Sequence, residues 1–64
     1  MDYKVFHTKA DAEREIANMR GWAARPVRLC WPGHPWAHDW EGVQYVWGIC
    51  CGGDKYLRDD GYVR

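Results

Sequence analysis

The first third of the chain shows a strand pattern followed by a helix pattern. In residues 3–7, Tyr3, Val5 and His7 alternate with Lys4 and Phe6, which predicts a short strand. Thr8 is a suitable N-cap residue, and Asp11 stands three residues later, where a negative charge favours a helix N-terminus. Gly21 is typical of a helix end. Apolar residues recur at spacings of four, three and four residues, at Ala12, Ile16, Met19 and Ala23. We therefore predict a helix over residues 9–20.

The rest of the chain has the pattern of strands separated by turns. Residues 27–31 and 43–50 are predicted strands, and the turn signals Gly52-Gly53 and Asp60-Gly61 lead to two further short strands, 55–58 and 62–64. The predicted order is β-α-β-β-β, to which residues 62–64 would add a terminal β-ribbon. This order indicates an α+β fold in which a single helix packs on a small, mostly antiparallel sheet. The expected registers place Trp31 opposite Val43 and Ile49 opposite Tyr56.

Both faces of the predicted sheet are apolar, yet one short helix can cover only one of them. In the expected register, one face carries Tyr45, Trp47, Ile49, Tyr56 and Arg58, and the other carries Val46, Cys50 and Leu57. One interpretation is that the loop over residues 32–42 folds back and its tryptophans seal the second face. The other is that this aromatic surface stays exposed and binds a partner. We expect sealing for most of the residues, with Trp36 or Trp40 and the acidic residues Asp39 and Glu41 left available for contact.

Length and composition limit the class of protein. The chain has 64 residues, of which ten are aromatic (five Trp, four Tyr and one Phe). This length accommodates a single compact domain, residues 1–64, and excludes a doubly wound nucleotide-binding fold or a barrel. We find no catalytic motif and expect no enzymatic activity and no cofactor. No apolar run is long enough for a membrane span, so we expect no membrane partner.

The charge distribution argues against a general nucleic-acid binder. Nine basic and nine acidic residues give a net charge of zero, and residues 30–54 contain no Lys or Arg. A nucleic-acid-binding surface normally shows a basic stripe and a high pI, whereas the pI here is about 6.8. Weak nucleic-acid binding through Arg20, Arg25 and Arg28 remains an alternative.

The three cysteines are a poor disulfide framework, because their number is odd and Cys50 and Cys51 are adjacent. We therefore expect free thiols and a cytoplasmic location. Cys30, His34 and His38 stand at four-residue intervals but are one ligand short of a tetrahedral zinc site. A domain stabilised by a metal on these three residues is a second alternative, although we expect no metal site.

Trp, Tyr and Arg dominate the energetics of protein interfaces, and the region rich in these residues is the candidate site. The chain resembles, in size and profile only, the small phage-encoded inhibitor proteins of the anti-CRISPR type. The resemblance implies a viral, cytoplasmic inhibitor that covers a working surface of a larger host complex, such as a host defence complex. A homodimer is an alternative, because an uncovered sheet face or edge can pair with a second copy. The expected partner-binding residues are Trp36, Asp39, Trp40, Glu41, Tyr45, Trp47, Tyr56 and Arg58.

Overall fold

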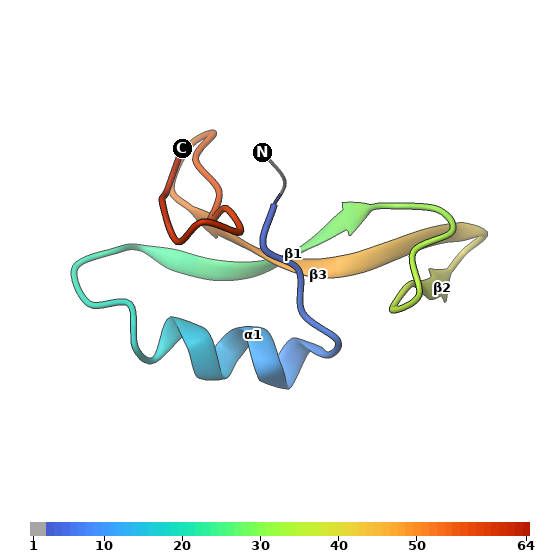
Figure 1. The fold of residues 1–64 in the computed structure, drawn as a ribbon. Coiled ribbons are helices and arrows are strands. Elements are labelled where there is room, and N and C mark those ends of the chain that lie inside the picture. Colours follow the sequence, from blue (N-terminus) through green and yellow to red (C-terminus); the bar gives the residue numbers. More distant parts are fainter. Residues whose placement is uncertain (1–2) are drawn as a thin grey trace.

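One helix and a three-stranded antiparallel sheet make up the regular structure (Figure 1). The structure is a computed structural model that describes residues 3–64. Its elements are α1 (Lys9–Ile16), β1 (Ala24–Cys30), β2 (His38–Trp40) and β3 (Val43–Cys51), and the strand order in the sheet is β1-β3-β2. The predicted α+β class is confirmed. The predicted order is wrong in detail, because the helix precedes all three strands.

Helix α1 begins where the sequence predicts and ends earlier. Thr8 has extended backbone angles, and its hydroxyl accepts a hydrogen bond from the Asp11 N–H at 3.1 Å. The predicted end at residue 20 is wrong, because α1 ends at Ile16 and the chain continues in turns. Asn18 favours turns over helix, and its N–H bonds to the Glu15 carbonyl three residues back. With eight residues α1 cannot cross a membrane, and residues 3–64 contain no other candidate span.

Strand β3 is the centre of the sheet along most of its length. One edge of β3 pairs with β1 over residues 45–51, and the other edge pairs with β2 over residues 43–45. Farther along that second edge, the Phe6 N–H donates to the Trp47 carbonyl at 2.8 Å and the Leu57 N–H to the Ile49 carbonyl at 3.0 Å. The predicted strands over residues 3–7, 55–58 and 62–64 are therefore wrong, since these segments make isolated bridges and then bend away.

Strand β2 lies inside the segment that the sequence predicts to be a loop. Glu41 and Gly42 both have positive φ angles, 48° and 81°. This is the conformation of a two-residue hairpin turn whose twist matches that of the flanking strands. The turn pairs Trp40 with Val43 and continues the sheet to His38.

Both predicted registers are wrong by one residue. Cys30 lies opposite Tyr45, one position from the expected Gln44, and Tyr56 bridges to Cys50 in place of Ile49. In the second case the Cys51 N–H bonds to the Lys55 carbonyl, so the hairpin loop has three residues, 52–54, where two were expected. A shift of one residue moves a side chain to the other face of a sheet. Leu57 therefore joins Ile49 on the helix side, and Tyr56 lies on the opposite face.

Each face of the sheet has a buried centre. On the helix side, Ala12 packs with Ile49, Cys51 and Leu57. On the opposite side Val46 and Cys50 are also buried, and Figure 1 shows the first described residues and the C-terminal segment on that side of the sheet. The expectation that the tryptophans of residues 32–42 seal this face is wrong. Their side chains remain largely accessible, because the segment curls around one end of the sheet and reaches β2.

Candidate functional site

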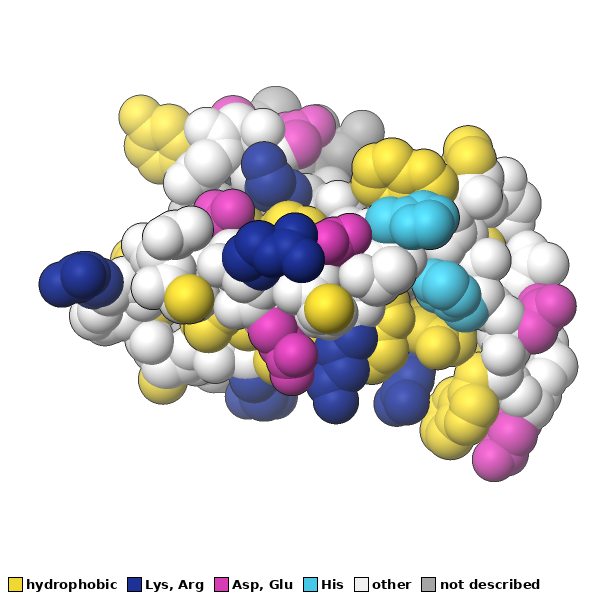
Figure 2. Space-filling view, turned by 90° about the horizontal axis from the view of Figure 1, so that it is seen from below, with side chains coloured by type: hydrophobic (Ala, Val, Ile, Leu, Met, Phe, Trp, Pro, Cys, Tyr) yellow, Lys and Arg dark blue, Asp and Glu magenta, His cyan; other side chains and the backbone are white. Residues whose placement is uncertain are grey.

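Seven aromatic and imidazole rings form a continuous row around the end of the sheet that carries β2. Neighbouring rings in this aromatic row have centroids 4.9 to 6.3 Å apart, and four of the six contacts are edge-to-face. Viewed from the helix side, histidine and hydrophobic side chains gather at this end of the molecule (Figure 2). The members, in order of contact, are Trp31, His34, Trp36, His7, His38, Tyr45 and Trp47.

Two hydrogen bonds between histidine rings and backbone groups hold the row in place. The Trp36 N–H donates to Nδ1 of His34 at 3.0 Å, and Nε2 of His38 donates to the His7 carbonyl at 2.8 Å. The second bond connects β2 to the segment before α1. The row therefore joins three parts of the chain that are distant in sequence.

Arg28 is held among three aromatic rings beside this row. Its guanidinium carbon lies 4.7 Å from the ring centre of Trp40, 5.3 Å from that of Tyr45 and 5.2 Å from that of Trp47. The three rings come from β2 and β3, and Arg28 comes from β1, so all three strands contribute to this Arg28 cluster. Lys9 of α1 also approaches the Trp47 ring, with Nζ 5.9 Å from its centre. Each cation–π contact contributes about 0.5–1 kcal/mol where the groups are exposed.

Arg28 has a free hydrogen-bonding fork. Within residues 3–64 the ion pairs are Arg14 with Asp11 and Arg64 with Asp60. No described side chain or carbonyl accepts a hydrogen bond from the Arg28 guanidinium, and the residue is exposed. The aromatic rings therefore position this cation without neutralising it.

The structure brings together four of the eight residues expected to bind a partner. Trp36, Tyr45 and Trp47 belong to the aromatic row, and Trp40 joins them through Arg28. Trp36 and Trp40 are 43% and 50% exposed, whereas Tyr45 and Trp47 are half-buried.

The two acidic residues do not form a common rim with the tryptophans. Asp39 pairs with Gln44, so its side chain lies on the face of the sheet opposite to that of Trp40. Glu41 lies in the hairpin turn that follows β2 and is exposed. Only Glu41 is therefore adjacent to the tryptophan surface.

Tyr56 and Arg58 lie apart from the aromatic row, which corrects their expected position beside Trp47. The Tyr56 ring packs against Tyr3 at 5.3 Å, and the Arg58 guanidinium lies 4.5 Å from the Tyr3 ring centre. Arg58 also donates to the Arg64 carbonyl from Nε and Nη2. These contacts attach the C-terminal segment to the N-terminal one and leave neither residue in the candidate site.

The residues of the metal alternative are not gathered around one point. Cys30 and His38 both lie opposite Tyr45, on its two sides, so about two strand spacings, some 9.5 Å, separate their backbones. Nδ1 of His34 already accepts the Trp36 N–H. Within the described residues, no group of three or more His, Cys, Asp or Glu side chains is arranged to hold a metal ion.

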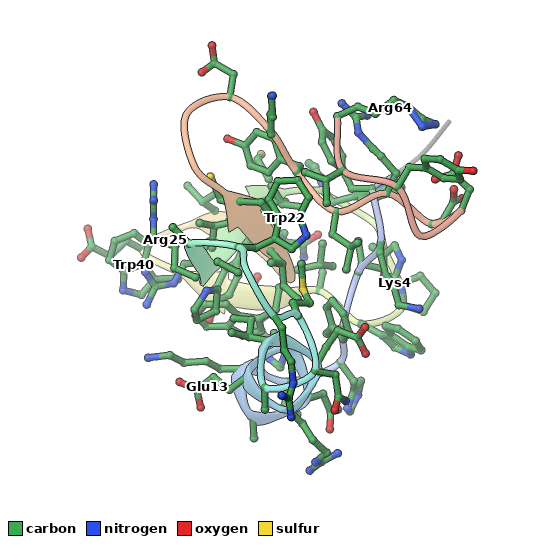
Figure 3. All side chains as sticks on the ribbon, turned by 90° about the vertical axis from the view of Figure 1, so that its left-hand side faces the viewer. Lys4, Glu13, Trp22, Arg25, Trp40 and Arg64 are labelled. Atoms are coloured by element: carbon green, nitrogen blue, oxygen red, sulfur yellow. The ribbon has the colours of Figure 1, made fainter. Side chains whose placement is uncertain are left out.

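The three arginines of the nucleic-acid alternative do not form a stripe. Arg25 lies opposite Cys50 and Arg28 opposite Trp47, so the two side chains leave β1 on opposite faces. Arg20 is in the turn region after α1. Figure 3 shows Arg25 and Trp40 on one flank of the molecule, with Lys4 on the other flank.

The cysteines are not arranged for nucleophilic chemistry. Burial, together with the neighbouring Cys50 thiol, raises the pKa of the Cys51 thiol above its ordinary value. A thiol that keeps its proton is a weak nucleophile. Cys30 is exposed and free, and Cys50 is buried, with its thiol 3.5 Å from the Gly53 carbonyl.

Sequence reasoning missed Arg28 and Lys9 as parts of this surface. In the expected register Arg28 faces Val46, and the true register places it opposite Trp47. His7 was also missed, because it joins the row from a segment more than twenty residues away in sequence. The signal available in the sequence was the alternation of side chains along β1. In the true pairing, Arg28 lies on the same face of the sheet as the odd-numbered aromatic residues of β3.

Comparisons of the chain with protein-family models, with curated proteins and with solved structures found no match.

Proposed function

We propose that this chain is a non-enzymatic protein-binding module whose contact surface is the aromatic row together with the Arg28 cluster. The observation that carries the proposal is the exposure of Trp36 in the aromatic row and of Trp40 in the Arg28 cluster, at 43% and 50%. Exposed aromatic patches on small proteins mark interaction sites. Tryptophan, tyrosine and arginine are also the residues most enriched at the centres of interfaces.

The proposed contact surface is preorganised for binding. Edge-to-face contacts and the two histidine hydrogen bonds restrict the rings. Less side-chain entropy is then lost on association. Small phage-encoded inhibitors, which the chain resembles in size and profile, act stoichiometrically in the cytoplasm by covering a working surface of a larger host complex. We propose this mode of action here.

A capture experiment with a matched tryptophan control tests the proposal. Tagged protein is incubated with nuclease-treated lysate of the cells that express it, and the retained proteins are identified and quantified by mass spectrometry. Trp22 is the control, because it is 48% exposed and belongs to the connection between α1 and β1, which lies at the opposite end of the sheet from β2 (Figure 1). Wild type and Trp22→Ala should retain the same partner in stoichiometric amount, and Trp36→Ala/Trp40→Ala should lose it.

Two results would contradict the proposal. The first is retention of the same partner by the double variant, which would place the contact surface elsewhere. The second is the absence of any specifically retained protein with wild type. Circular dichroism of all variants distinguishes loss of the surface from loss of the fold.

A further inference from the structure

The charge of the candidate surface differs from the charge of the segment that supplies its tryptophans. Residues 30–54 contain acidic residues and no Lys or Arg. The fold adds Arg28 from β1 and Lys9 from α1, both over the Trp47 ring. Asp39 is removed to the opposite face by its pairing with Gln44. The part of the candidate surface around the Trp47 ring is therefore cationic.

The Arg28 guanidinium retains the donors needed to bind a carboxylate. Cation–π contacts use the faces of aromatic rings, whereas the five N–H donors of a guanidinium lie in its own plane. None of those donors has an acceptor within residues 3–64. A planar fork with free donors matches a carboxylate in a bidentate arrangement.

Two acidic side chains, one on α1 and one in the β2–β3 turn, leave the Arg28 donors open. Glu13 lies on α1 on the same flank as Trp40 (Figure 3), and Glu41 follows Trp40 in the hairpin turn. Neither is within ion-pair distance of Arg28 in the described structure. Both side chains are exposed, and neither pairs with the Arg28 guanidinium.

We propose that the partner is a protein segment that places an Asp or Glu carboxylate on Arg28, between Trp40 and the Tyr45–Trp47 pair. This inference rests on the proposed function and names the chemistry of its partner. The carboxylate pairs with the guanidinium, and the apolar side chains beside it pack on the exposed rings of Trp36 and Trp40. Ordered rings that exclude water around a charge pair strengthen the pair.

Charge complementarity favours an acidic protein over a nucleic acid. A single-stranded nucleic acid needs a basic groove that follows several successive phosphates. This surface has only Arg28 and Lys9 in the described cation–aromatic contacts around Trp47, and Arg25 lies on the other face of β1. One preorganised fork suits one carboxylate.

Selection of peptides tests this inference. A random peptide library displayed on phage is selected on the immobilised protein, and the enriched peptides are synthesised for measurement of Kd by calorimetry. Each is also made with its Asp or Glu replaced by Asn or Gln. We expect the enriched peptides to share an acidic residue. Replacing that residue, or introducing Arg28→Gln, should weaken binding at least about 30-fold, and the two changes together should weaken it little further.

The control variants separate charge, shape and fold. Arg25→Gln removes a positive charge from the same strand on the opposite face and should leave Kd unchanged. Arg28→Lys keeps the charge and loses the planar guanidinium, so its Kd should lie between those of wild type and Arg28→Gln. Thermal unfolding of each variant establishes that the compared proteins are folded.

The outcomes distinguish this inference from the proposed function. If Trp36→Ala weakens peptide binding and Arg28→Gln does not, the protein-binding surface stands and the carboxylate anchor is wrong. If no selected peptide depends on either residue, both are wrong. Tight binding of a twelve-nucleotide oligothymidine that displaces the peptides and weakens steeply with salt would overturn the inference in favour of nucleic acid.

Discussion

Arg28 on β1 lies directly opposite Trp47 on β3, with its guanidinium carbon 5.2 Å from the centre of the indole ring. Nineteen positions of sequence separate the two residues, and only the register of the β1–β3 pair brings them together. The same register puts Arg28 on the face of the sheet that carries Tyr45 and Trp40, whose ring centres lie 5.3 and 4.7 Å from its guanidinium carbon. A single strand pairing thus creates a cation among three rings at the exposed end of the sheet.

We predict a measurable coupling between Arg28 and Trp40. Their cation–π contact should contribute about 0.5–1 kcal/mol to the free energy of unfolding. Urea unfolding of Arg28→Gln, Trp40→Ala and the double variant measures this coupling as the departure from additivity. The same cycle with Arg25→Gln should be additive, because Arg25 leaves the strand on the opposite face. Additive behaviour of the Arg28 cycle would show that the rings do not hold the cation.

The parts of the fold that the sequence predicts correctly depend on local signals. Thr8 caps α1 as expected, and the alternation of residues 43–50 marks β3 to within one residue. The chain segments that make isolated bridges have similar alternation, but no neighbouring strand pairs with them over several consecutive residues. Whether an alternating segment becomes a strand depends on tertiary contacts. Neither the three-residue strand β2 nor the end of α1 at Ile16 has a strong local signal.

The candidate site was less predictable because it depends on register. The sequence predicts Trp36, Trp40 and Trp47 as members of the site, and four of the eight expected residues do gather. Arg28 could not be assigned to them while Trp31 was placed opposite Val43. An eleven-residue connection does not fix the pairing of its flanking strands, and a shift of one residue exchanges the faces of every side chain. Tyr56 was misplaced for the same reason, through a hairpin loop one residue longer than expected.

Gly48 is the position in β3 where an added side chain should be destabilising. A Cβ atom there would collide with Cδ1 of Leu29 and lie 3.1 Å from its Cγ. Leu29 is half-buried on the edge strand β1 and can move in part. We therefore expect Gly48→Ala to lower the free energy of unfolding by about 1 kcal/mol, at the lower end of overpacking costs. Leu29→Val in the Gly48→Ala background should recover part of the loss, as measured by urea unfolding; a full additive loss would contradict the steric explanation.

Glu41 occupies a backbone conformation that a side chain disfavours. Its φ angle is 48°, in the left-handed region, as the first residue of the β2–β3 turn. Asn adopts this conformation at lower cost and is common at the first position of such turns. Glu41→Asn should raise the free energy of unfolding by about 0.5–1 kcal/mol. Glu41→Gln is the matched control, because it removes the charge but keeps the conformational cost. An equal gain from both variants would attribute the effect to charge.

The buried Cys51 thiol should make stability fall at alkaline pH. Burial and the adjacent Cys50 thiol raise the Cys51 pKa above its ordinary value of 9.0. Between these two pKa values the folded chain holds a proton that the unfolded chain has released, so the free energy of unfolding decreases as pH rises. This contribution is fully present below pH 9 and is lost above it.

Urea unfolding between pH 7 and pH 10.5 measures this dependence, with Cys51→Ala as the test variant and Cys30→Ala as its control. Cys30 is exposed, so its removal should leave the alkaline slope unchanged. Cys51→Ala should lower stability at pH 7, because it removes a buried side chain from the core beside Ile49 and Leu57. Its stability should nevertheless change less with pH than that of wild type, because the titrating thiol is gone. Parallel pH profiles for wild type and Cys51→Ala would show that this thiol is ordinary in the folded state, and that another group causes any alkaline loss.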